Sequence, residues 1–262
     1  MQELLSYSFF QHALLASLLI SIATGIIGSL IVVNRMVFLS GGIAHASYGG
    51  IGMALFFGLP IFFGATIFSI AVAIMIAFIS LKNKEHIDTI IGLIWAVGMA
   101  IGIVFIDKTT GYKADLMSYL FGSILAVSKS DIYYMIAVVV TILLCITFWY
   151  RKILAVSYDI SYASLLGINT KFFYTMILVL SSLTIVIAIK VVGLILVIAL
   201  LTIPTYISLK LSSTLSKMMT LSVLFSLVFS FTGLFLSYYF DITSGASIIL
   251  VSAVGFIITS LF

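Results

Sequence analysis

The chain has 262 residues, of which 63% are hydrophobic and only 8% are charged. Soluble domains carry about 45–50% apolar and about 25% charged residues, so this composition excludes a water-soluble globule. A scattered net charge of +4 excludes a clustered basic face for nucleic acid, and the single cysteine excludes an internal disulfide or a cysteine-type zinc site. We therefore expect an all-α, polytopic protein in the lipid bilayer, forming one transmembrane domain over residues 1–262.

Apolar segments of about 20 residues, the length of helix that crosses the hydrocarbon core, follow one another along the chain. Nine are expected, at 9–33, 36–57, 61–81, 88–106, 131–150, 172–189, 191–209, 218–240 and 244–262. Residues 116–125 are also apolar, but Asp115 and Lys129 bound a tract too short to cross. This tract predicts a re-entrant or interfacial helix, so the number of crossings is about nine, within a range of eight to ten.

Basic residues divide unequally between the two sides that these spans define. Eight fall on one side, namely Arg35, Lys82, Lys84, Arg151, Lys152, Lys171, Lys210 and Lys217. Four fall on the other, namely Lys108, Lys113, Lys129 and Lys190. Because Lys and Arg are retained on the cytoplasmic side, we expect the first side to be cytoplasmic, with the N-terminus outside the cell membrane and the C-terminus inside.

The acidic residues are expected at helix ends or in loops: Glu3, Glu85, Asp88, Asp107, Asp115, Asp131, Asp159 and Asp241. A proton-coupled transporter or pump usually holds carboxylates deep in the membrane, so this distribution disfavours that class. The chain also contains no G-x-x-x-x-G-K-[ST] phosphate-binding loop. If nucleotide powers this protein, another subunit holds it.

His45 is the ionisable side chain expected near the middle of a span. Small residues surround it at helical spacing. One face of the helix would carry His45 with Gly41 and Gly49, four residues to either side, and the adjacent row would carry Gly42, Ala46 and Gly50. Neighbouring backbones can therefore approach the imidazole closely. Imidazole is a good ligand for zinc and other first-row metal ions, so His45 is a candidate ligand on a metal pathway. The alternative is a buried histidine hydrogen-bonded to a neighbouring carbonyl.

The cytoplasmic loop at 158–168 is apolar for a loop. Asp159 can cap a helix and Gly167 can end it, so we expect one short exposed helix. Ala163 and Gly167 are four residues apart, which predicts a small surface that fits a groove on a partner. The alternative is an amphipathic helix lying on the membrane.

Five tracts in register carry a resemblance that spans essentially the whole chain. They are residues 41–47 around His45, 115–116 with 120–123, 159–167, 191–196 leading into 200–204, and 237–239 with Asp241. Through them the chain resembles the permease subunits of the zinc and manganese ABC importers, a type II importer branch.

This resemblance implies a homodimeric pore, two cytoplasmic ATPase subunits and an external metal-binding protein that delivers the ion. The ion is transported cargo, and no permanently bound cofactor is expected. His45 would correspond to the family's metal-pathway histidine, and Asp159, Ala163 and Gly167 would lie in the loop that couples to the ATPase. The chain would then be no enzyme itself, since its partners hydrolyse ATP.

One position departs from the family pattern. Many members carry an aspartate four residues before this histidine, where the present chain has Gly41. Without that carboxylate, ligation rests on His45 from each copy, backbone carbonyls and water, which favours zinc slightly over manganese. A stand-alone secondary transporter or channel for a cation is the alternative function.

Overall fold

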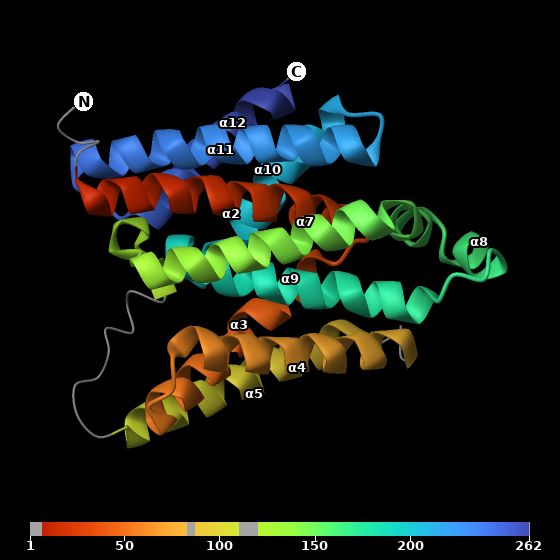
Figure 1. The fold of residues 1–262 in the computed structure, drawn as a ribbon, viewed down its shortest axis with the longest axis horizontal. Helices are drawn as coiled ribbons and strands as arrows, with labels where there is room; N and C mark the ends of the chain where they lie inside the picture. Colours follow the sequence, from red (N-terminus) through yellow and green to blue (C-terminus); the bar gives the residue numbers. More distant parts are fainter. Residues whose placement is uncertain (1–6, 83–86, 110–119, 262) are drawn as a thin grey trace. The chain divides into compact units, whose positions relative to one another are not determined.

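The computed structural model describes residues 7–82, 87–109 and 120–261. Eight long helices, two shorter ones and one 3₁₀ turn make up these residues, without a strand among them. In chain order they are α2 (Ser8–Val33), α3 (Val37–Phe57), α4 (Ile61–Lys82), α5 (Ile87–Lys108), η1 (Ile124–Ala126), α7 (Lys129–Tyr158), α8 (Ile160–Leu165), α9 (Thr170–Val192), α10 (Val197–Leu211), α11 (Leu215–Phe240) and α12 (Ser244–Leu261) (Figure 1). The all-α prediction is confirmed for the described residues.

Each of the nine expected spans corresponds to one helix, but the helices differ in how well they suit a membrane crossing. By length and composition, seven of the described helices can cross: α2, α4, α5, α7, α9, α11 and α12. The apolar helix α10 has only 15 residues, and α3 carries glycine, serine and histidine through its 21. The protein is thus a multi-pass helical chain, and the total of nine crossings stays a prediction.

The described residues divide into two compact units. The first unit comprises residues up to 32, 120–148 and 187 onward, and the second comprises residues 33–109 and 149–186 as far as they are described. The prediction of one transmembrane domain over residues 1–262 is not tested by this division, because each unit is built from separate stretches of chain.

Small and hydroxyl-bearing residues hold the first unit together. Ser226 of α11 pairs with Thr24 of α2 at 3.1 Å between hydroxyl oxygens, and Ser222 pairs with Thr205 of α10 at 2.9 Å. Gly25 meets the backbone of Val223. Lipid gives apolar helices no reason to associate, so close backbone approach and hydrogen bonds between buried hydroxyls supply the cohesion.

In the second unit, α3 packs against both α4 and α5 (Figure 1). The approach is close enough that a Cβ added at Gly50 would lie 2.6 Å from the carbonyl oxygen of Gly64 on α4. On α5, a Cβ at Gly98 would lie 2.6 Å from the Cα of Ala46. The small residues that the sequence places around His45 therefore act as helix-packing positions.

Two helix boundaries differ from those expected. The span expected at 191–209 is interrupted, because α9 continues to Val192 and α10 begins at Val197. Gly193, with φ +84, ends α9, and the N–H of Ile195 donates to the carbonyl of Leu120 rather than to a helical partner. In addition, α7 extends past the expected residue 150 to Tyr158, with a kink at Trp149 where φ is −115° and ψ is 15°.

Candidate functional site

His45 lies in the middle of α3, at the contact with α5. Its imidazole stacks on the indole of Trp95, with ring centroids 3.9 Å apart and an angle of 14° between the planes. The indole Nε1–H in turn donates to the thioether sulfur of Met99 at 3.2 Å. Both rings are partly buried, and the backbone contact between Ala46 and Gly98 lies one to three residues away. Two helices that approach so closely bring their aromatic side chains face to face.

The Nδ1 atom of His45 is buried and has no hydrogen-bond partner among the described residues. No carbonyl among the described residues is bonded to Nδ1, and the metal role of His45 stays a prediction. Ser17 Oγ and Ser69 Oγ share this state, and a buried polar atom of this kind is commonly satisfied by a water molecule or an ion. A nitrogen lone pair without a protein partner can accept a metal ion.

Other metal-ligating side chains do not gather around this imidazole. The described residues contain no group of three or more His, Cys, Asp or Glu that could hold a metal ion. Gly41, one helical turn before His45, is buried and contributes no side chain. His86 falls outside the described residues, as do Glu3, Glu85 and Asp115. Among the described residues of the second unit, His45 is thus the candidate nitrogen ligand in the middle of a helix.

The described carboxylates lie at helix ends, as the sequence predicts. Asp88 and Asp131 lie in the first turns of α5 and α7, and Asp107 lies in the last turn of α5. Asp159 is the N-cap of α8, and Asp241 is the C-cap of α11. Among the residues described, none is at the middle of a helix, where a proton-coupling carboxylate would be expected.

The short helix expected in the cytoplasmic loop is α8. The carboxylate of Asp159 accepts a hydrogen bond from the Tyr162 N–H at 2.9 Å, so the predicted cap is confirmed. Beyond Leu165, Gly167 adopts φ +74 and its N–H donates to the carbonyl of Ser164, which closes the helix as predicted. Nothing lies within 4 Å of a Cβ added at Gly167.

The exposed surface of α8 differs from the small surface that spacing predicts. Ala163 is fully buried, with 0% of its surface exposed, so it does not contribute to the outside of the helix. Leu165 is 87% exposed and Tyr162 is 56% exposed. The Ile168 N–H donates a hydrogen bond to the Ala163 carbonyl, so the chain after α8 stays close to this residue. The exposed surface of α8 therefore includes large apolar side chains beside the hydroxyls of Ser161 and Ser164.

A groove of about 510 Å³ lies beside α8 in the same unit. Its lining residues are Trp149, Lys152, residues 166–169, Phe172 and Phe173. Trp149, which lines the groove, is also the residue at which α7 kinks. The loop at 158–168, which is predicted to contact a partner, thus combines the exposed helix α8 with an adjoining open groove. Lys152 is the basic residue of that groove.

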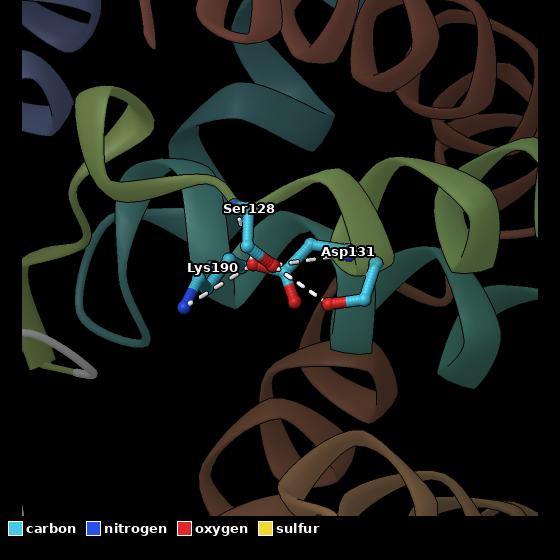
Figure 2. A network of polar contacts seen from close by, with 4 residues as sticks. Ser128, Asp131 and Lys190 are labelled. Carbon is cyan, nitrogen blue, oxygen red and sulfur yellow. Dashed lines mark hydrogen bonds and ion pairs between the residues drawn. The ribbon is translucent and has the colours of Figure 1, made fainter.

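In the first unit, charged and backbone groups join three segments that are distant in sequence. Figure 2 shows the carboxylate of Asp131, which accepts from the Ser128 N–H at 2.9 Å and lies 3.5 Å from the Lys190 ammonium. The Ser123 N–H donates to the Lys190 carbonyl at 3.2 Å, and the Ile124 N–H donates to the Ser244 hydroxyl at 3.1 Å. These bonds connect the start of α7, the end of α9 and the start of α12.

Glycines make this joining possible, and we call the place where they meet the glycine junction, formed by Gly122, Gly193 and Gly245. Gly122 and Gly193 meet backbone to backbone, both with positive φ. A Cβ at Gly245 would lie 2.6 Å from the carbonyl oxygen of Val192. Three of the tracts that carry the family resemblance, those at 120–123, 191–196 and 237–241, therefore lie at or beside one structural feature.

Sequence reasoning missed Trp95 and Met99. Their spacing of four residues places both on one face of α5, which is the available signal, but a tryptophan at that position is ordinary in an apolar helix. That the indole lies on the His45 ring depends on how α3 and α5 pack, which single-sequence patterns do not contain.

Comparison with known proteins agrees with the helical, multi-pass architecture. The model of the ABC 3 transport family matches residues 6–262, so the chain belongs to this family of membrane transport proteins. An uncharacterized membrane protein of Synechocystis is 44% identical over 262 residues, covering 100% of this chain and 93% of the relative.

Two further relatives have informative names. The manganese transport system membrane protein MntC of Listeria monocytogenes is 35% identical, with the same coverage of 100% and 93%. Among solved structures, PsaBC from Streptococcus pneumoniae in complex with Fab matches with a TM-score of 0.89 and 32% identity, covering 98% of this chain and 93% of that one. The fold is thus that of an ABC transporter permease.

Proposed function

We propose that this chain is the membrane-spanning subunit of an ATP-driven importer that moves a divalent transition metal ion, manganese or zinc, into the cytoplasm. Membership of the ABC 3 transport family supports transport, and the Listeria relative's name supports manganese. The metal is cargo, and no permanently bound cofactor is part of the proposal.

The observation that carries the metal assignment is the unpartnered Nδ1 of His45 in the middle of α3. Two copies of the chain would form the pore, each contributing one imidazole. Few ligands suit a pathway from which the ion must leave again. With Gly41 in place of the carboxylate that many relatives carry, nitrogen ligation favours zinc, whereas the Listeria name favours manganese.

The partners follow from the family and from the chemistry of α8. Cytoplasmic ATPase subunits would dock on the exposed apolar face of α8 and the adjoining groove, with Asp159 and Gly167 holding the helix in shape and Ala163 anchoring it from inside. An external metal-binding protein would deliver the ion to the opposite side. The basic residues support a cell-membrane orientation with the N-terminus outside and the C-terminus in the cytoplasm.

Uptake into proteoliposomes tests the proposal. Vesicles that hold the chain with its ATPase subunits and are supplied with the metal-binding protein should accumulate radiolabelled manganese or zinc only when ATP is present, and the ratio of the two rates identifies the cargo. His45→Ala should abolish this uptake while co-purification with the ATPase remains. Uphill accumulation by vesicles with this chain alone would instead establish a stand-alone transporter.

A further inference from the structure

The Trp95 indole covers one face of the His45 imidazole. The ring planes are nearly parallel, at 14°, and their centroids are 3.9 Å apart. Both nitrogens of an imidazole lie on the edge of the ring, with their lone pairs or N–H bonds in its plane. A partner on the face therefore restricts how the ring can rotate without occupying either nitrogen.

This arrangement differs from the usual way in which proteins orient a histidine ligand. A metal-binding histidine normally donates its second N–H to a carboxylate, carbonyl or water, and that bond fixes the ring. Among the described residues, the Nδ1 of His45 has no such partner. The stacked indole is the contact that can hold the imidazole plane in place.

Trp95 is itself held on two sides. Its Nε1–H donates to the Met99 sulfur at 3.2 Å, one turn further along α5. The backbone contact between Gly98 and Ala46 keeps α5 close to α3 at this level. The indole therefore cannot swing away from His45 without breaking a hydrogen bond.

We infer that Trp95 is a positioning residue for the metal pathway, which orients the His45 imidazole by stacking on its face and leaves the unprotonated ring nitrogen free to bind the ion. The inference rests on the proposed role of His45 as a pathway ligand. A metal ion bound to the imidazole draws electron density from the ring, and the indole face stabilises that positive charge. Loss of the indole should thus weaken ion binding more than it weakens folding.

Aromatic pairs contribute free energies that correspond to roughly a 2- to 10-fold change in an equilibrium constant. Trp95→Leu should therefore weaken Mn²⁺ or Zn²⁺ binding to the purified transporter, measured by calorimetry, by about that factor. Trp95→Phe keeps an aromatic face and should recover most of the loss. The matched control is Phe105→Leu, because Phe105 also lies on α5 and contacts Phe56 of α3, at 5.2 Å between centroids.

Fluorescence provides a second readout, since the chain has only two tryptophans. Trp149→Phe leaves Trp95 as the single indole emitter. Mn²⁺ is paramagnetic, so its binding at His45 should quench Trp95 emission in a saturable way. Adding His45→Ala to the Trp149→Phe protein should remove the saturable quenching.

The outcomes separate this inference from the proposed function. Suppose that His45→Ala abolishes uptake. If Trp95→Leu then binds metal as tightly as Phe105→Leu does, or if Mn²⁺ does not quench Trp95 emission, the positioning role of Trp95 is wrong while the proposed transport function stands. If His45→Ala transports normally, the proposed role of His45 fails first. A monodisperse elution profile of each variant ensures that folded transporters are compared.

Discussion

The closeness of α3 to α5 can be tested by adding one methyl group at Gly98. A Cβ there would lie 2.6 Å from the Cα of Ala46 and 2.8 Å from its Cβ. Ordinary contacts begin near 3.4 Å, so the backbones would have to separate by about 0.8 Å, the difference between 3.4 and 2.6. Overpacking of this kind costs about 1–3 kcal/mol.

Gly92 on the same helix is the matched control, because nothing lies within 4 Å of a Cβ placed on it. Alanine is favoured over glycine in a helix interior by about 0.8–1 kcal/mol, so Gly92→Ala should be neutral or stabilising. Gly98→Ala should lower the apparent Tm in detergent, by roughly 2–4 °C for each kcal/mol lost.

The same substitution should disturb the His45 and Trp95 stack, since Gly98 lies three residues after Trp95 on α5 and contacts Ala46, the neighbour of His45 on α3. Emission of Trp95 in the Trp149→Phe protein should therefore change on Gly98→Ala and stay constant on Gly92→Ala. Equal Tm values for the two alanine variants would refute the close packing on which the site geometry depends.

Three further predictions concern helix α8 and the ion pair between Asp131 and Lys190 in the first unit. Asp159→Ala should remove the α8 cap, cost about 1 kcal/mol and reduce metal-stimulated ATP hydrolysis, whereas full coupling in this variant would separate the cap from coupling. Gly167→Ala should also reduce coupling, because its positive φ costs a residue with a Cβ about 1–2 kcal/mol, and Gly167→Asn should do so less. Lys190→Gln and Asp131→Asn should be non-additive in unfolding free energy by about 0.5 kcal/mol or more in a double-mutant cycle, and strict additivity would mean that the ion pair contributes nothing.

The sequence predicts much of the helical framework because lipid imposes a length on each span. The boundaries of α2, α4 and α12 follow from apolar length alone. Residues that act locally are also predictable: Asp159 caps α8 and Gly167 ends it, since each bonds to backbone within a few residues. His45 stays a predicted ligand, chosen because an ionisable side chain in the middle of an apolar segment is costly without a function.

What depends on packing between distant segments could not be predicted. Spacing places Ala163 on the surface of α8, but the local fold turns it inward. The break between α9 and α10, which delays the start of α10 to Val197, lies where Gly193 contacts residues 120–122, some 70 positions earlier in the chain. Trp95 illustrates the same limit, because no pattern along α5 indicates which ring it meets on α3.

The glycine junction has a consequence for how this protein can change over time. Its three segments touch through main-chain atoms, whose shape is common to every amino acid, and glycine alone is demanded at the points of contact. The side-chain contacts beside the junction, Asp131 with Lys190 and Ser244 with the Ile124 N–H, add to these main-chain contacts. Substitutions at the three glycines are therefore the changes that would force these segments of the main chain apart.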